Sequence, residues 1–350
     1  MKRAPRGAAS SGPPGARSRG FIHGLLAVCL PAALCLGLRE TVSAQELPRG
    51  RTEPEGVAAL AEACAGENPG RVSPCRELAL AALAFQRGAG LGSALGSDVP
   101  GTASTAGHRL GGVPRIAFSV GLAGIRMGMP RVSARSAGGL AEEEVVTAIG
   151  VRGVVAAGIV DGLQLAPGFG GILSVDLTGV FSRLWLPRDA GFEGPSAAVG
   201  LGARIGILRE SFTVPGISVS LGRRWHGAVR AGDGNPGEVE AQLEVTSARA
   251  VLGKNWFALG LLAGAGWDRY AGEAVVSVGG GLDDPGSEGG TLASERTVYF
   301  LAGWYNFVIS QISAEIGLAD GVGSPFPGRS AGYDPGRRDW FASVSVRVAP

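Results

Sequence analysis

Apolar and polar residues alternate over most of the chain, and the segment "ISVSLGRRWHGAVR" at 217–230 shows the pattern clearly. Its odd positions are mostly apolar, whereas its even positions are polar or small. A period of two is typical of a β-strand with one apolar and one polar face. A soluble sheet would turn the apolar face inward, whereas a transmembrane barrel would turn it outward against lipid.

The same alternation predicts strands throughout residues 114–350, the predicted barrel domain. We expect ten, with eight and twelve left open, and place them at 114–128, 144–158, 170–185, 196–208, 215–230, 239–252, 256–279, 292–305, 307–320 and 339–350. Their connections alternate between long polar loops and short turns, and only "VDGLQLAPGFG" at 160–170 breaks this rule. Long loops at one end and tight turns at the other are typical of transmembrane barrels.

Residues 1–44 predict a cleaved signal peptide. Basic residues precede the apolar run "FIHGLLAVCLPAALCLGL", and "VSA" at 42–44 supplies small residues for cleavage. A permanent membrane anchor is the alternative, but Pro31 interrupts a run of marginal length. Without this segment acidic residues outnumber basic ones, so we expect no nucleic-acid partner.

Residues 45–90 predict a periplasmic helical hairpin. The stretches "EGVAALAEAC" and "PCRELALAALAF" have helical character, and we expect the second helix to end at Gly88 or Gly90. Cys64 and Cys75 flank a Pro-Gly turn, and one cysteine pair in an exported chain favours a disulfide. The hairpin would dock beneath the barrel or enter it as a plug.

Composition separates this chain from ordinary soluble domains. Charged residues make up 18%, below the roughly one quarter that is typical of soluble proteins. Glycine reaches 60 of 350 residues, without the three-residue period of collagen. The stretch at 91–113 is rich in Gly, Ser and Thr, which predicts a linker between the hairpin and the barrel.

Tryptophan and arginine positions predict two interfacial girdles. Four tryptophans fall near long-loop ends of the predicted strands and two near short-turn ends, as expected for amphipathic rings at membrane borders. The predicted girdle residues are Trp185, Trp225, Trp256, Trp267, Trp304 and Trp340, with Arg183, Arg223 and Arg269 beside them.

With these features the chain resembles bacterial outer-membrane β-barrel proteins over residues 114–350. The resemblance implies an antiparallel transmembrane β-barrel, so we expect an all-β fold in which the small disulfide-closed helical hairpin precedes the barrel. It also implies a place in the bacterial outer membrane, contact with lipid and lipopolysaccharide, insertion by the barrel-assembly machinery, and a monomeric state. The chain departs from the pattern at its end, where Pro350 stands in place of the terminal aromatic residue of the assembly signal.

Charged residues on the predicted lumen faces are expected to pair across neighbouring strands, since buried charges need partners. Folding each hairpin about its turn sets Arg152 opposite Asp176, Asp176 opposite Arg204, Arg230 opposite Glu240, and His226 opposite Glu244. The predicted lumen network is Arg152, Asp176, Arg204, Arg224, His226, Arg230, Glu240 and Glu244.

These patterns favour a narrow or gated passive channel for small solutes, or a membrane-structural protein. A barrel that binds lipopolysaccharide or another surface partner is the alternative. His226 beside Glu244 is the one candidate for a hydrolase dyad, and because no nucleophile is placed beside it we do not expect an enzyme. We expect no cofactor and no metal site. The sequence leaves open which solute or ligand is involved and whether the lumen is open or plugged.

Overall fold

The computed structural model describes residues 54–107, 113–130, 143–166, 169–188, 191–232, 237–279, 282, 287–326 and 333–348. The predicted signal peptide lies outside the described residues. No helix in the described ranges is both long enough and apolar enough to cross a membrane.

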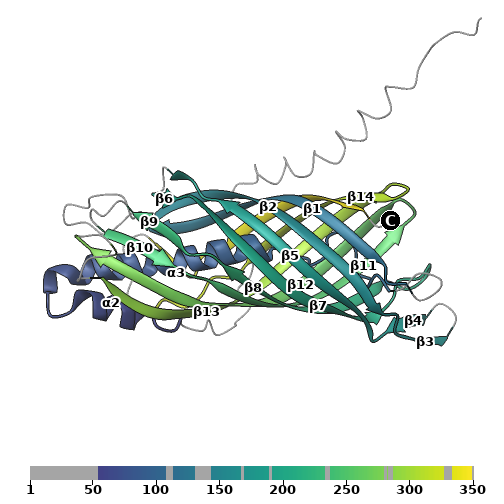
Figure 1. The fold of residues 1–350 in the computed structure, drawn as a ribbon, viewed down its shortest axis with the longest axis horizontal. Helices are drawn as coiled ribbons and strands as arrows, with labels where there is room; N and C mark the ends of the chain where they lie inside the picture. Colours follow the sequence, from purple (N-terminus) through teal and green to yellow (C-terminus); the bar gives the residue numbers. More distant parts are fainter. Residues whose placement is uncertain are drawn as a thin grey trace, which may run out of the picture. The chain divides into compact units, whose positions relative to one another are not determined.

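Ten antiparallel strands close into a barrel, which confirms the predicted fold class (Figure 1). In ring order they are β1 (Ile116–Pro130), β2 (Glu143–Val160), β5 (Ser174–Trp185), β7 (Pro195–Leu208), β8 (Gly216–His226), β11 (Glu244–Trp256), β12 (Leu259–Val278), β13 (Glu288–Asn306), β14 (Ser310–Ala319) and β15 (Asp339–Val348). The ring closes because β15 pairs with β1 and β11 pairs with β12.

Connections of different length lie at the two ends of the barrel. The long-loop end carries the connections from β1 to β2, β5 to β7, β8 to β11, β12 to β13 and β14 to β15. The short-turn end carries those from β2 to β5, β7 to β8, β11 to β12 and β13 to β14. The irregular stretch at 160–170 lies at the short-turn end, where β3 (Leu163–Ala166) and β4 (Phe169–Ile172) form a small hairpin.

The wall is taller on one side. At the long-loop end β12 pairs with β10 (Gly237–Ala241), β10 pairs with β9 (Val229–Gly232), and β9 pairs with β6 (Phe192–Glu193). These short strands extend the sheet beyond the ends of β8 and β11, around the amino-terminal helices (Figure 1).

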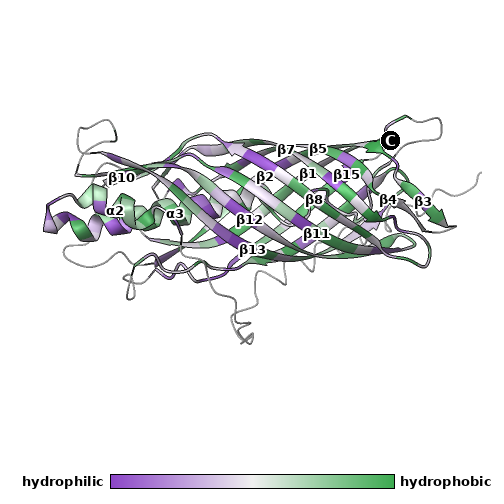
Figure 2. Cartoon of the chain, turned by 90° about the horizontal axis from the view of Figure 1, so that it is seen from below, coloured by the Kyte–Doolittle hydropathy of each residue, from purple (hydrophilic) through white to green (hydrophobic). Residues whose placement is uncertain are grey.

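Side chains on the strands alternate between the two faces of the wall. Along β12, Leu259 and Leu261 are exposed on the outside, whereas Leu262, Asp268 and Tyr270 are buried inside. Figure 2 shows apolar residues distributed along the ribbons of the barrel. A strand with apolar residues outside and mixed residues inside is typical of a barrel wall in lipid.

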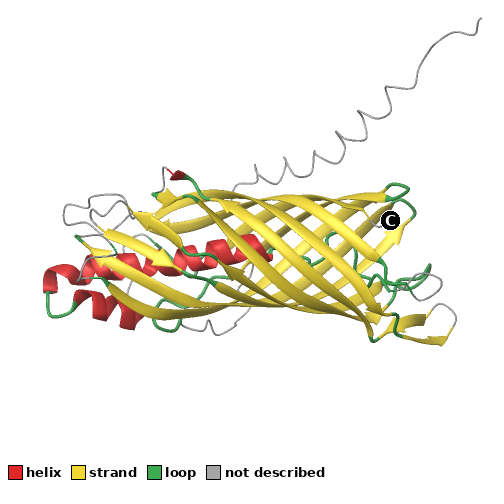
Figure 3. Cartoon of the chain, viewed as in Figure 1, coloured by secondary structure: helices red, strands yellow, loops and turns green. Residues whose placement is uncertain are grey.

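The amino-terminal part contains α2 (Val57–Ala65), the short 3₁₀ helix η1 (Pro69–Arg71) and α3 (Val72–Ala94). The predicted disulfide between Cys64 and Cys75 is present and ties α2 to α3, with 5.6 Å between the Cα atoms. Helix α3 runs inside the barrel and contacts β1, β2, β5, β10, β11, β12 and β13 (Figures 1 and 3).

The amino-terminal segment passes from the long-loop end to the short-turn end. Glu55 forms two backbone hydrogen bonds with Ala293, near the long-loop end of β13. After α3 the chain continues down the lumen as far as Gly107, which lies beside Asp161 and Arg209 at the short-turn end. We call residues 72–107 the plug.

The expectation that the second helix ends at Gly88 or Gly90 is wrong, because α3 continues to Ala94. A Cβ atom at Gly88 would overlap the Met127 side chain, and one at Gly90 would overlap the Tyr270 ring. The glycines that resemble helix terminators in the sequence therefore serve to fit the helix closely against the barrel wall.

Candidate functional site: the plugged lumen

Side chains fill the lumen along the length of α3. Residues 78–94 of the helix are all buried, and they pack against inward residues of the wall such as Ile125, Met127 and Tyr270. Because close-packed protein leaves few voids larger than a water molecule, this part of the barrel is a core rather than a pore.

The carboxyl end of α3 is held by arginines of the wall. Arg249 of β11 donates to the backbone oxygens of Leu95 (3.1 Å) and Gly96 (3.0 Å). Arg152 of β2 donates to the oxygens of Ser97 (3.1 Å) and Asp98 (3.1 Å), and at 3.4 Å to that of Ala94. Carbonyls at a helix end lack helical partners and carry partial negative charge, so guanidinium groups stabilise them.

A carboxylate on the wall binds the backbone donors that follow the helix. Glu315 of β14 accepts hydrogen bonds from the backbone N–H groups of Gly96 and Ser97, both at 3.0 Å, and from the Ser97 hydroxyl at 2.8 Å. Together with the arginines it satisfies both donors and acceptors of the turn at 94–98, which lies in the lumen.

The lower part of the plug is bound in the same way. Arg204 of β7 donates to the backbone oxygens of Ser104 (2.6 Å) and Thr102 (3.3 Å). Asp176 of β5 accepts from the backbone N–H of Ala106, at 3.0 and 2.9 Å to its two oxygens. Side chains of the wall therefore form hydrogen bonds with the plug down to its last described residues.

The arginines in the lumen also have buried carboxylate partners. Arg249 and Asp268 lie 2.6 Å apart, Arg224 and Asp98 2.6 Å, and Arg204 and Asp176 2.8 Å. Asp98 belongs to the plug, so its ion pair with Arg224 of β8 joins plug and wall directly. Buried ions that lose their partner are costly, which makes these pairs sensitive to substitution.

The predicted pairing of Arg152 with Asp176 is absent. Strands β2 and β5 pair with Gly158 opposite Asp176 and Ser182 opposite Arg152. The prediction folded the two strands about residue 164, but the β3–β4 hairpin and a register shift near Val160 lie between them and change the pairing. The expected pairing of Asp176 with Arg204 is present.

The predicted pairing of His226 with Glu244 is also absent. His226 lies between two hydroxyls, with Ser93 at 2.9 Å from Nε2 and Ser196 at 3.2 Å from Nδ1. Glu244 faces outward and pairs with Arg223. A serine beside a histidine resembles part of a hydrolase site, but Ser93 is 2% exposed, and both imidazole nitrogens face serine hydroxyls rather than a carboxylate of the described residues. The arrangement is therefore a polar contact between plug and wall.

Arg230 and Glu240 do pair, at 2.5 Å, but they lie outside the lumen. They belong to β9 and β10, whose inward positions are the apolar Val229, Val239 and Ala241. The even positions of 239–252 were predicted to face the lumen because they carry acidic residues. The odd positions face inward instead, since the lumen here holds an apolar helix rather than water.

Because the inward face of 239–252 was predicted wrongly, a central lumen residue was also missed. Arg249 occupies an odd position of β11 and was assigned to the outer face, yet it is among the most buried side chains of the described chain. The sequence could have predicted that Arg249 faces inward, because a charged residue at a lipid-facing position near Val251 would be costly in a membrane.

Five of the six predicted girdle tryptophans face outward. Trp185, Trp225, Trp267 and Trp340 lie near the long-loop ends of their strands, and Trp256 lies at the short-turn end. The expectation for Trp304 is wrong. It is 4% exposed and points into the barrel, where it donates to Asn255 at 2.7 Å and fills the space opposite Gly260.

The predicted girdle arginines lie beside outward tryptophans. Arg183 stacks over Trp185 and Arg223 over Trp225, with 5.5 and 5.7 Å to the ring centroids. Arg269 lies 4.0 Å from Glu295, which also accepts a hydrogen bond from Trp267. Arg126 was not among the predicted girdle residues, yet it is exposed on β1 directly opposite Trp340 of β15. The long-loop girdle thus combines outward aromatic rings with charged side chains that lie beside them.

A second set of contacts closes the lumen near the long-loop end. Arg87 of α3 donates to the Pro335 backbone oxygen at 2.8 Å and to the Tyr333 hydroxyl at 3.4 Å, and lies 3.6 Å from Asp339. Arg296 of β13 pairs with the same Asp339 at 2.8 Å. Burial raises the pKa of Tyr333 to about 12, so it remains a neutral hydroxyl near neutral pH. The last long loop is therefore fastened to the plug helix.

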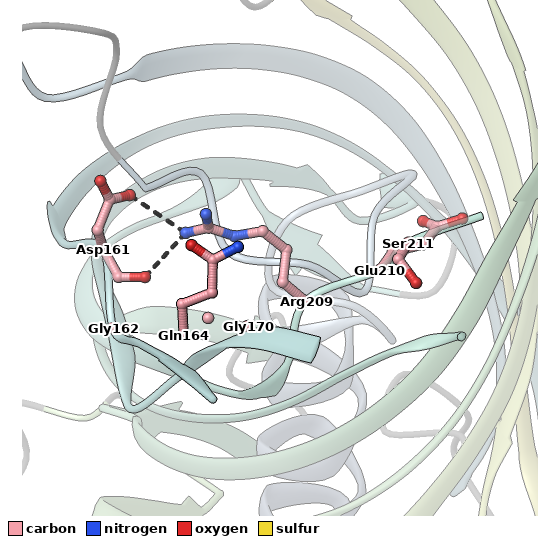
Figure 4. Close-up of a pocket in the computed structure, with 8 residues that line it drawn as sticks. Asp161, Gly162, Gln164, Gly170, Arg209, Glu210 and Ser211 are labelled. Carbon is pink, nitrogen blue, oxygen red and sulfur yellow. Dashed lines mark hydrogen bonds and ion pairs between the residues drawn. The ribbon is translucent and has the colours of Figure 1, made fainter. Parts of the chain in front are cut away.

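A cavity of about 360 Å³ lies at the short-turn end, between the β3–β4 hairpin and the start of the loop from β7 to β8 (Figure 4). Arg209 reaches across it to the backbone oxygen of Asp161 at 2.9 Å and to its carboxylate at 3.2 Å. Gln164 lies close to this guanidinium, and Glu210 and Ser211 lie on the other side. The cavity is small and polar, and it lies beside the point where the plug reaches the end of the barrel.

No protein-family model and no curated protein match the chain. Solved bacterial barrels do. The translocator domain of the autotransporter NalP from Neisseria meningitidis aligns with a TM-score of 0.37 and 10% identity, over 67% of this chain and 88% of that one. The outer membrane protease OmpT from Escherichia coli aligns with a TM-score of 0.36 and 9% identity, over 68% of this chain and 96% of that one. The Pseudomonas putida toluene transporter TodX aligns with a TM-score of 0.30 and 10% identity, over 72% of this chain and 95% of that one. The names of these proteins imply different activities, so the role of this chain has to be inferred from its own residues.

Proposed function

We propose that the protein is an outer-membrane β-barrel that its own amino-terminal segment keeps closed, with a membrane-structural or tightly gated role. The outward positions of the strands support a place in lipid, since exposed apolar residues such as Leu201, Leu221 and Leu261 cover the wall below the Trp/Arg ring. Such a belt between aromatic girdles is typical of a barrel in a bilayer.

The main support for the closed state is the set of hydrogen bonds and ion pairs that join the wall to the turn at 94–98. Arg152, Arg224, Arg249 and Glu315 come from four different strands, and all four bind this turn. A solute channel through this level would need the plug to move and all four side chains to find new partners. We therefore expect the resting protein to pass no steady current.

The orientation follows from the usual arrangement of such barrels, in which short turns face the periplasm and longer loops face outward. Because α2 lies at the long-loop end, this arrangement places the disulfide-closed hairpin at the cell surface. The long-loop rule and the expected periplasmic hairpin cannot both hold, and we propose the surface position.

Recordings in planar lipid bilayers test the closed state. The mature protein should insert without steady conductance steps, whereas the double variant Arg152→Gln/Arg249→Gln should give transient steps because it releases the end of α3. The matched control is Arg183→Gln/Arg269→Gln, which removes two outward arginines and should be as silent as the parent protein. Folding of each variant is checked by the shift in gel mobility between unheated and boiled samples. Steady ohmic steps from the parent protein would contradict the proposal and favour an open channel.

Lipid contact and a monomeric state fit a barrel whose ring of ten strands is complete within one chain. Insertion by the barrel-assembly machinery remains a prediction. Lipopolysaccharide binding has weaker support, since Arg223 and Arg269 already have the carboxylates of Glu244 and Glu295 beside them. Bound phosphate groups would have to compete with these acidic partners.

A further inference from the structure

Each of the four connections at the short-turn end carries an exposed apolar side chain. Val308 and Phe257 are 100% and 98% exposed at the tips of two turns, and Phe212 is 92% exposed in the loop from β7 to β8. In the β3–β4 hairpin Leu165 is also exposed. We call this surface the short-turn rim. Large apolar side chains that gather fully exposed at one end of a molecule indicate contact with a membrane or another protein.

We propose that the short-turn rim is a lipid-contacting surface whose turn tips lie within the inner leaflet of the membrane. This inference rests on the proposed place of the barrel in a bilayer. It goes further in assigning the depth of the barrel and the partner of the rim, which is the interfacial region of the lipid rather than the aqueous periplasm.

The length of the apolar belt supports this depth. Trp267 in the long-loop girdle follows Phe257 in the turn before β12 by ten positions. They span about 34 Å along a strand, or about 26 Å along the axis at a tilt of about 40°. This equals the roughly 25 Å of the apolar band in such barrels. With Trp267 at the outer border, the inner border therefore falls at the turn tips.

Aromatic residues mark the same inner border. Trp256 and Tyr305 are the last outward residues of β11 and β13 before their turns, and the ring centroids of Tyr305 and Phe307 lie 4.9 Å apart. Aromatic rings prefer the level of the lipid headgroups. No described outward residue of β11 or β13 follows these two rings, so both strands end at this level.

The polar groups near the rim are bound to one another. The ammonium of Lys254 donates to the backbone oxygens of Ser211, Phe212 (2.9 Å) and Val214 (3.3 Å). Glu210 accepts from the Asn255 side chain at 2.5 Å. Arg209 and Asp161 pair across the cavity in Figure 4. Internal hydrogen bonds lower the cost of removing these groups from water, which an interfacial position requires.

Fluorescence quenching of single-cysteine variants in lipid vesicles tests the proposal. A polarity-sensitive dye is attached at Val308→Cys in the rim, Leu261→Cys in the apolar belt, or Glu273→Cys on the outward face of β12 beyond the girdle, in chains that retain the Cys64–Cys75 disulfide. Vesicles of phosphatidylcholine and phosphatidylethanolamine carry nitroxide lipids, and iodide is present on both sides. We expect nitroxide lipids to quench the dyes at 261 and 308 at least several-fold more than the dye at 273, and iodide to quench only the dye at 273.

The result at Leu261→Cys distinguishes a failure of the rim proposal from a failure of the proposed membrane barrel. If nitroxide quenches the dye at 261 while iodide quenches the dye at 308, the barrel is in the membrane but the rim lies in water, and the rim proposal is wrong. Shielding of 308 from both quenchers, with a signal that depends on the protein-to-lipid ratio, would indicate a protein partner and would equally overturn it. If nitroxide does not reach 261, the proposed membrane barrel itself fails.

Discussion

At the scale of single residues, the arginines of the lumen and those of the outer face differ in their exposure and in the number of their partners. Arg249 has a carboxylate partner, two carbonyl partners in the plug and almost no exposure. Arg269 has a distant carboxylate partner and is about half exposed. Exposed ion pairs contribute little, whereas removing one member of a buried pair leaves an uncompensated charge.

We therefore predict that Arg249→Gln lowers the stability of the folded barrel by about 3 to 5 kcal/mol, because it leaves Asp268 buried and unpaired. The matched control Arg269→Gln should change stability by no more than about 1 kcal/mol. Both are measured by urea titration of the protein in detergent or lipid vesicles. Equal effects of the two substitutions would show that the lumen around Arg249 is wet.

Asp176→Asn should also lower the heat resistance of the folded barrel, since Asp176 pairs with Arg204 and accepts from the Ala106 backbone. It should leave the lumen closed, because Arg152 binds the backbone of the plug and is not held by Asp176. The measurements are the temperature at which the folded band is lost on a gel and the conductance in planar bilayers. Unchanged heat resistance would contradict the contact with Ala106.

At the scale of elements, the period of two in the sequence predicts all ten strands of the barrel, since lipid outside the wall enforces strict alternation. The inner faces were harder to predict. Polar groups were predicted to face the lumen, but Val245 and Ala241 face inward because α3 provides an apolar partner there. The length of α3 was also missed, since glycine signals a helix end in a sequence and close packing in this structure.

The glycines of α3 give a prediction of their own. Gly90→Leu should displace the helix or destabilise the barrel, because a side chain there would overlap the Tyr270 ring. Overpacking of this kind costs about 1 to 3 kcal/mol, occasionally more. The control is Gly124→Leu on the outer face of β1, where nothing lies within 4 Å of the added Cβ. Urea titration and protease sensitivity of the amino-terminal segment report the difference. Identical behaviour of the two variants would place α3 outside the wall.

At the scale of the whole described barrel, the apolar belt and the tall side of the wall imply an asymmetric position in the membrane. The belt ends at the short turns, whereas β12 and β13 continue beyond Trp267 by about ten residues and surround the amino-terminal helices. This upper wall contacts α2 and the start of α3, and it would stand in water outside the outer leaflet.

An epitope inserted between Gly66 and Glu67, in the turn after α2, tests this orientation. It should be detected by an antibody on intact cells, because the proposed surface position leaves this exposed turn outside the membrane. A periplasmic protein serves as the control for cell integrity. Detection only after permeabilisation would place the hairpin in the periplasm.

The most direct test of the central claim is a cross-link between the plug and the inner wall. The hydroxyl oxygens of Thr105 in the plug and Ser174 in β5 lie 2.5 Å apart, so two cysteines at these positions should form a disulfide. The variant Thr105→Cys/Ser174→Cys should therefore cross-link almost completely in the folded, membrane-inserted protein. The control Thr105→Cys/Val175→Cys should not, since Val175 lies next in the strand and faces outward. Free thiols at 105 and 174 in the folded protein would contradict a barrel closed by its own chain.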